Sequence, residues 1–82
     1  MLKGIIRGTI VSTRKQDALV GSKFMELQLI ENGALTDKFI IAIDSVGAGI
    51  GETVLVTTGS SARLALHNTG APADAVIVGI VD

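Results

Sequence analysis

Hydrophobic and polar residues alternate along most of this 82-residue chain, a pattern typical of β-strands that pack one face against a core. The alternation predicts five strands, over residues 2–13, 23–31, 37–44, 52–58 and 75–81. One short helical turn is expected over residues 62–66, after two serines at 60 and 61, either of which can cap it. Because no long helix is expected between the strands, the pattern excludes a parallel βαβ sheet and favours a small five-stranded all-β barrel of the OB type.

Glycines mark the turns and bends of this expected barrel. Asn32-Gly33 is the strongest hairpin signal in the chain, because both residue types adopt the positive φ angles of a type I′ turn. It predicts antiparallel pairing of the second strand with the third. Gly4, Gly8 and Gly79 lie inside strands, where glycine is typical of a bulge or of a bend at a barrel corner.

The strands differ in how many of their faces are apolar. In the second strand Met25, Leu27 and Leu29 share one face, which predicts that this face alone points inward. In the fourth strand Val54 and Val56 are expected on one face, and Thr53, Leu55 and Thr57 on the other. The third and fifth strands are apolar on both faces, so both faces are expected to be buried. With no long helix to cover the outer face, another subunit is the expected cover.

Composition leads to the same expectation. The chain is long enough for one domain, residues 1–82, and a single core of this size supplies only about 3–5 kcal/mol. It has no cysteine and one histidine, so disulfides and the usual zinc ligand sets are excluded, and neither a metal nor a cofactor is expected. With 48% hydrophobic residues, association between copies is the stabiliser that remains.

Charge and hydropathy narrow the choice of partners. The net charge is −1 and there is no polybasic tract, which argues against nucleic acid as a partner. No apolar run reaches the roughly 18–20 residues of a membrane span, and no signal peptide is evident, so a cytoplasmic protein without a membrane partner is expected. The alternative is an OB-fold nucleic-acid-binding module, which would have to stack bases on Phe24 and Phe39 alone.

A glycine-rich stretch follows the third strand and raises a third hypothesis, a nucleotide site. Gly47, Gly49 and Gly51 stand at alternate positions, but Glu52 occupies the place of the third glycine in a dinucleotide fingerprint. No lysine follows Lys38, so a P-loop is excluded as well. The stretch is therefore predicted to be a bend between two strands. No catalytic residue is expected either, since nothing marks an oxyanion hole beside the serines at 60 and 61.

Four blocks of the sequence, residues 8–15, 44–56, 59–63 and 74–82, resemble the EutN/CcmL family of bacterial microcompartment vertex proteins. Val-Gly-Ala-Gly-Ile-Gly-Glu at 46–52 and Gly-Ser-Ser-Ala-Arg at 59–63 are specific when they occur together. The resemblance spans nearly the whole chain. It departs from the family pattern in the second strand, where Glu26 interrupts a run that is more uniformly aliphatic in relatives.

The resemblance implies an OB-like barrel that forms a homopentamer and caps the five-fold vertices of a microcompartment shell, beside hexameric or trimeric shell proteins. It implies a structural protein of the cytoplasm, located in the shell, and not an enzyme. It also implies a set of positions tied to assembly, at the subunit interface or the central opening. These positions are Gly47, Gly49, Gly51, Ser60, Ser61 and Arg63.

Overall fold

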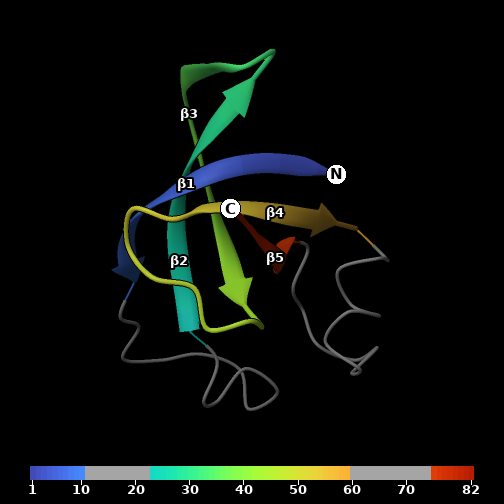
Figure 1. Ribbon diagram of the computed structural model, residues 1–82. Helices are drawn as coiled ribbons and strands as arrows, with labels where there is room; N and C mark the ends of the chain where they lie inside the picture. Colours follow the sequence, from blue (N-terminus) through green and yellow to red (C-terminus); the bar gives the residue numbers. More distant parts are fainter. Residues whose placement is uncertain (11–22, 60–74) are drawn as a thin grey trace.

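A computed structural model describes residues 1–10, 23–59 and 75–82 of the chain (Figure 1). The described residues form five strands that close into a barrel in the order β1-β2-β3-β5-β4. The strands are β1 (Leu2–Ile10), β2 (Lys23–Glu31), β3 (Ala34–Asp44), β4 (Thr53–Thr58) and β5 (Ala75–Val81). The expected five-stranded all-β barrel is thereby confirmed. The predicted helical turn over residues 62–66 and the end of the first predicted strand lie outside the described residues.

The β2–β3 hairpin turns at Asn32-Gly33, as predicted. Asn32 and Gly33 have φ angles of 53° and 79°, the signs that a type I′ turn requires. Pairing resumes immediately after the turn, at Glu31 and Ala34, so β3 begins three residues before its predicted start at residue 37. Figure 1 shows the tip of this hairpin reaching beyond the body of the barrel.

A bulge shapes the outer half of the hairpin. Gln28 pairs with Phe39 and Ile30 with Leu35, so two steps along β2 match four along β3. Thr36 lies in the bulge, where its hydroxyl donates to the Leu29 carbonyl at 2.8 Å and its own carbonyl accepts from the Gln28 amide at 2.7 Å. These bonds satisfy polar groups that the irregular ladder leaves free.

The core lies where the inner faces of the strands meet. Met25, Leu27 and Leu29 are buried along β2, which confirms the predicted inner face. The fully buried large side chains come from four of the five strands. They are Ile6, Leu27, Val54, Val56, Val76 and Ile77.

Thr57 lies on the face of β4 opposite Val54 and Val56, as the alternation predicts, but it is buried as well. Thr57 pairs with Val76 and Val56 pairs with Ile77, and all four residues are buried, so this end of the β4–β5 pair is covered on both faces. The register shifts at the next pair, where Leu55 lies opposite Gly79 and Val78 is an extra residue on β5. Such a bulge bends the strand, which helps a sheet of only five strands to close.

Close packing inside the barrel explains the first strand glycine. A side chain at Gly4 would place its Cβ 3.0 Å from the Gln28 carbonyl oxygen on the neighbouring strand. Gly8 has no such neighbour, and it lies just after a register shift that separates it from Ile6. The expected irregularity of β1 is therefore found beside Gly8, whereas Gly4 lies in a regular part of the ladder and is explained by close packing.

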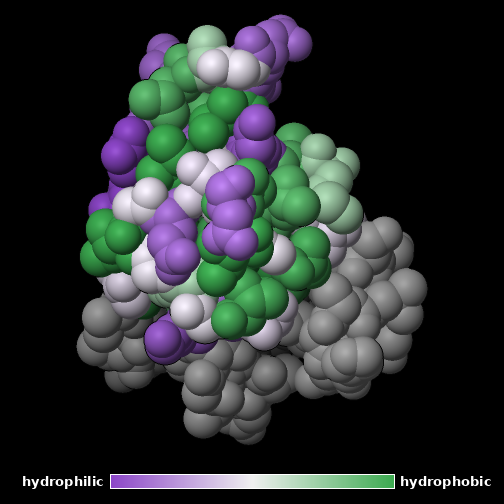
Figure 2. Space-filling view, in the orientation of Figure 1, coloured by the Kyte–Doolittle hydropathy of each residue, from purple (hydrophilic) through white to green (hydrophobic). Residues whose placement is uncertain are grey.

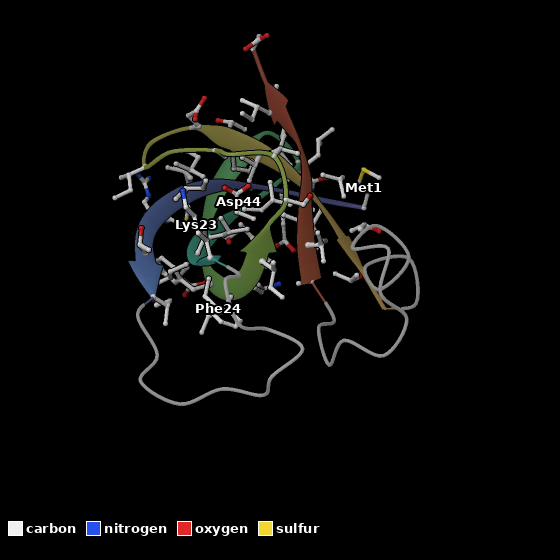
Figure 3. The ribbon with its side chains drawn as sticks, turned by 90° about the horizontal axis from the view of Figure 1, so that it is seen from below. Met1, Lys23, Phe24 and Asp44 are labelled. Carbon is white, nitrogen blue, oxygen red and sulfur yellow. The ribbon has the colours of Figure 1, made fainter. Side chains whose placement is uncertain are left out.

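The barrel is closed by a short parallel contact between β3 and β5. Only two residue pairs form it, Ile43 with Val76 and Asp44 with Ile77. The C-terminal end of β5 then runs away from β3 and projects from the barrel (Figure 3). Along the rest of β3, Phe39 and Ile41 are exposed within the chain, so the expected burial of its outer face is not achieved by the chain itself.

Candidate functional site

The glycine-rich bend connects β3 to β4 and begins with a turn closed by Asp44. The Asp44 carboxylate accepts hydrogen bonds from the backbone N–H groups of Val46 and Gly47, at 3.0 and 3.1 Å. Gly47 has a φ of 80°, which a side chain would disfavour. The Ser45 hydroxyl donates to the Ile77 carbonyl at 2.6 Å and ties the start of the bend to β5.

The second half of the bend is a turn over residues 49–52 that Glu52 closes twice. Its backbone N–H donates to the Gly49 carbonyl at 3.2 Å, and its carboxylate accepts from the Gly49 N–H at 2.6 Å. Gly51 has a φ of 91°, as glycine does at the third position of a type II turn. The three glycines are therefore not equivalent, because Gly47 and Gly51 have a positive φ and Gly49 does not.

The bend is fixed to the barrel at two places. The Gly51 N–H donates to the Ile6 carbonyl at 2.8 Å, and the Ile6 N–H donates to the Glu52 carbonyl at 3.0 Å. Ala48 points inward and belongs to the core cluster. Val46 and Ile50 point away from it, and Ile50 is 68% exposed. The bend therefore presents two apolar side chains on a backbone that its own carboxylates hold.

This geometry leaves no anion site in the bend. A phosphate-binding loop needs free backbone N–H groups that converge on the anion. Here the N–H groups of Val46, Gly47 and Gly49 already donate to Asp44 and Glu52. Those carboxylates occupy the place of an anion and would repel one. The prediction of a structural bend is favoured over the nucleotide site for this physical reason.

The described residues offer little for other chemistry. They contain no group of three His, Cys, Asp or Glu residues placed to hold a metal ion. Phe39 is half-exposed and Phe24 largely covered, so one aromatic ring is available for base stacking. Within the same residues, no helix is long and apolar enough to cross a membrane.

The structure brings three of the six predicted assembly positions together. Gly47, Gly49 and Gly51 share the bend, whereas Ser60, Ser61 and Arg63 lie outside the described residues. Their place at a subunit interface or a central opening stays a prediction.

The sequence analysis missed the carboxylates that close the two turns. The available signals were the Asp three residues before Gly47 and the Glu three residues after Gly49, spacings at which side-chain oxygens reach backbone N–H groups.

Along its whole length, this chain is similar to proteins of one known family. The family described as "Ethanolamine utilisation protein EutN/carboxysome" matches residues 1–82. The carboxysome shell vertex protein CcmL of Gloeobacter violaceus is 46% identical over 80 residues, which are 96% of this chain and 80% of the relative. The microcompartment shell vertex protein GrpN of Rhodospirillum rubrum is 41% identical over 88 residues, covering 100% of this chain and 93% of the relative.

Solved structures agree with the sequence relatives. The structure of Gloeobacter violaceus CcmL superposes with a TM-score of 0.94 at 44% identity, over 100% of this chain and 86% of that one. The GrpN pentameric microcompartment shell protein from Rhodospirillum rubrum superposes with a TM-score of 0.90 at 38% identity, over 100% of this chain and 94% of that one. By sequence and by fold, this chain belongs to the EutN/CcmL family.

Proposed function

We propose that this chain is a structural protein that forms a homopentamer and caps the five-fold vertices of a bacterial microcompartment shell. The observation that carries the proposal is the match over the full chain, in sequence and in fold, to proteins named as shell vertex proteins. One of the superposed relatives is described as pentameric. The chain would then act in the cytoplasm, within the shell, beside hexameric or trimeric shell proteins.

The role is geometric, and it requires no catalysis. A flat layer of six-fold tiles cannot close into a polyhedron without five-fold positions, so a ring of five has a task that depends on its shape. A head-to-tail interface closes into such a ring when its rotation divides a full turn. The chain is accordingly proposed not to be an enzyme. The bend supports this role, since it presents rigid apolar side chains where a ligand site would present free polar groups.

The bend is proposed as one of the surfaces used in assembly. Its glycines allow the two tight turns that hold Val46 and Ile50 outward. Gly47, Gly49 and Gly51 would serve assembly through this shape. Ser60, Ser61 and Arg63 are proposed to join them, on the resemblance of the block that contains them.

Native mass spectrometry of the isolated chain at micromolar concentration tests the ring. We expect one dominant species with five times the mass of the chain. A monomer, or a ring with another number of subunits, would contradict the proposal.

The nucleic-acid alternative is tested in parallel by titrating labelled single-stranded DNA at low salt, where a positively charged groove would bind most tightly. We expect no shift at submicromolar protein.

A further inference from the structure

Two apolar patches on the outside of the barrel are not covered within the described residues. The hairpin patch consists of Phe39 and Ile41 on β3, which are 50% and 55% exposed. The β5 patch consists of Leu55 on β4 and Val81 on β5, which are 36% and 39% exposed. In Figure 2 hydrophobic atoms gather along the projecting hairpin and around the C-terminal end of β5.

The edge of β3 adds to the exposure of the hairpin patch. Among the described residues, β3 pairs with β2 along its length, but on its other edge it pairs with β5 only at Ile43 and Asp44. The backbone from Ala34 to Ala42 therefore presents one open edge. An open apolar edge readily pairs with another chain, so proteins usually cover it.

Two charged side chains accompany the patches. Glu26 pairs across the sheet with Ile41 of the hairpin patch, and Lys3 pairs with Leu55 of the β5 patch. Lys38 and Glu31 form the one ion pair found in the described part of the chain, so neither Glu26 nor Lys3 has such a partner there. The strand position opposite Glu26 is Gly8, so no side chain of β1 stands across from it. Glu26 itself is half-buried.

The order of the strands puts both charges on the same side of the barrel. Going round from the β5 patch, the barrel passes through β4, β1, β2 and β3 to the hairpin patch. Lys3 on β1 and Glu26 on β2 thus lie between the two patches. In a ring, this side of every copy faces the same way. Along the strands the two charges lie at different levels, because Lys3 pairs with Ile30 whereas Glu26 pairs with Gly8, five residues further along β1. A junction between the hairpin patch of one copy and the β5 patch of the next brings Glu26 and Lys3 together if the copies are offset by this distance.

We propose that the hairpin patch of each copy packs against the β5 patch of the next copy, and that Glu26 pairs with Lys3 across the junction. The inference rests on the proposed function, because it assigns the surfaces of the ring. The two patches differ, which is what a head-to-tail interface requires. The opposite charges fix the register of the junction and disfavour partners that lack them. Glu26, which interrupts an otherwise aliphatic run, thereby gains a role.

A mixing experiment tests the two-patch junction. One variant carries Phe39→Ser and Ile41→Ser, and the other carries Leu55→Ser and Val81→Ser. Each variant alone lacks one side of every junction, so native mass spectrometry should show monomers. Mixed in equal amounts, they retain one intact junction between them and should form a heterodimer that grows no further. A ring from either variant alone, or a mixture of folded variants that stays monomeric, would overturn the inference.

Charge exchange tests the ion pair and does not depend on the folding of the patch variants. Lys3→Glu and Glu26→Lys should each raise the ring's dissociation constant at least about tenfold at low salt, because each places like charges together. The double variant should return to within about threefold of the original chain. Lys23→Glu makes the same charge change at the far end of β2 and should leave the ring unchanged. Failure of the double variant to recover would contradict the pairing.

The two proposals can fail separately. If the unmodified chain is a monomer, the proposed vertex function fails and the junction fails with it. If the unmodified chain is a pentamer and the patch variants remain pentamers, only the junction is wrong. Circular dichroism of each variant confirms that a monomer is folded before its mass is interpreted.

Discussion

The bend over residues 44–52 and the β2–β3 hairpin are both turn-rich connections, but they differ in how much of their backbone the same chain pairs. In the bend, the carboxylates of Asp44 and Glu52 accept hydrogen bonds from the backbone N–H groups of the turns. Ala48 packs in the core, and backbone hydrogen bonds to Ile6 join the bend to β1. The hairpin beyond the bulge leaves the barrel and exposes apolar side chains on a strand with an open edge. The backbone of the bend is therefore held by hydrogen bonds within one chain, although Val46 and Ile50 stay exposed, whereas the hairpin also leaves a strand edge unpaired.

The difference shows how one small chain divides its stabilising interactions. The conformation of the bend depends on contacts that a single copy already makes, so it should be the same before and after assembly. The hairpin depends on local turn chemistry for its shape and on another copy for the burial of its outer face. Stability of the bend should therefore be independent of protein concentration, while stability of the hairpin should rise with association.

The largest expected effect compares the same substitution in the two regions. Ala48→Asp places a carboxylate in the core beneath the bend, and a buried charge without a partner costs at least about 3 kcal/mol. Ala34→Asp, at the exposed start of β3, should change the free energy of unfolding by less than about 0.5 kcal/mol. Urea denaturation of both variants measures the difference. Equal losses would show that the bend is not anchored in the core.

A smaller effect separates two glycines of the bend. Gly51→Ala forces a side chain into a φ of 91° and should cost about 1–2 kcal/mol. At Gly49, by contrast, an added Cβ would meet only the flexible end of Glu52 at 3.4 Å, so Gly49→Ala should cost less than about 0.5 kcal/mol. Thermal melting at one protein concentration compares them. If Gly49→Ala proves the more damaging, the bend has a role beyond its own conformation.

The smallest effect compares two exposed carboxylates. Glu52→Ala removes the acceptor of the Gly49 N–H and should cost about 1 kcal/mol. Glu31→Ala removes the exposed ion pair with Lys38 at 3.3 Å on the hairpin, for which less than about 0.5 kcal/mol is expected. Glu52→Gln keeps an oxygen acceptor and should recover part of the loss. The prediction is contradicted if Glu31→Ala is as costly as Glu52→Ala.

Much of the barrel could be predicted from the sequence because its signals are local. Asn32-Gly33 determines the hairpin turn, and strict alternation determines the inner face of β2. The limits of β5 agree with the prediction to the residue. By contrast, Thr57 is buried because this end of the β4–β5 pair is covered on both faces. No pattern within β4 indicates that its second face is covered there.

The candidate site was predictable in position but not in detail. The density of glycine between two strands indicated a bend, and the spacing of Gly47, Gly49 and Gly51 argued against a dinucleotide fingerprint. The different demands on these glycines depend on φ angles that the sequence does not specify. Glu52 was interpreted only as a residue that repels phosphate, and its role in closing the turn becomes visible once its carboxylate is placed beside Gly49.

The parallel contact between β3 and β5 has a kinetic consequence. It joins Ile43 to Val76 and is supported by the Ser45–Ile77 hydrogen bond, so the ends that meet are more than thirty residues apart along the chain. Contacts between such distant residues carry a large loop-closure cost and tend to form late. A chain in which they have not yet formed would have a barrel that is open between β3 and β5. Only copies whose barrels have already closed could then join a ring. Assembly would thereby exclude copies that have not finished folding.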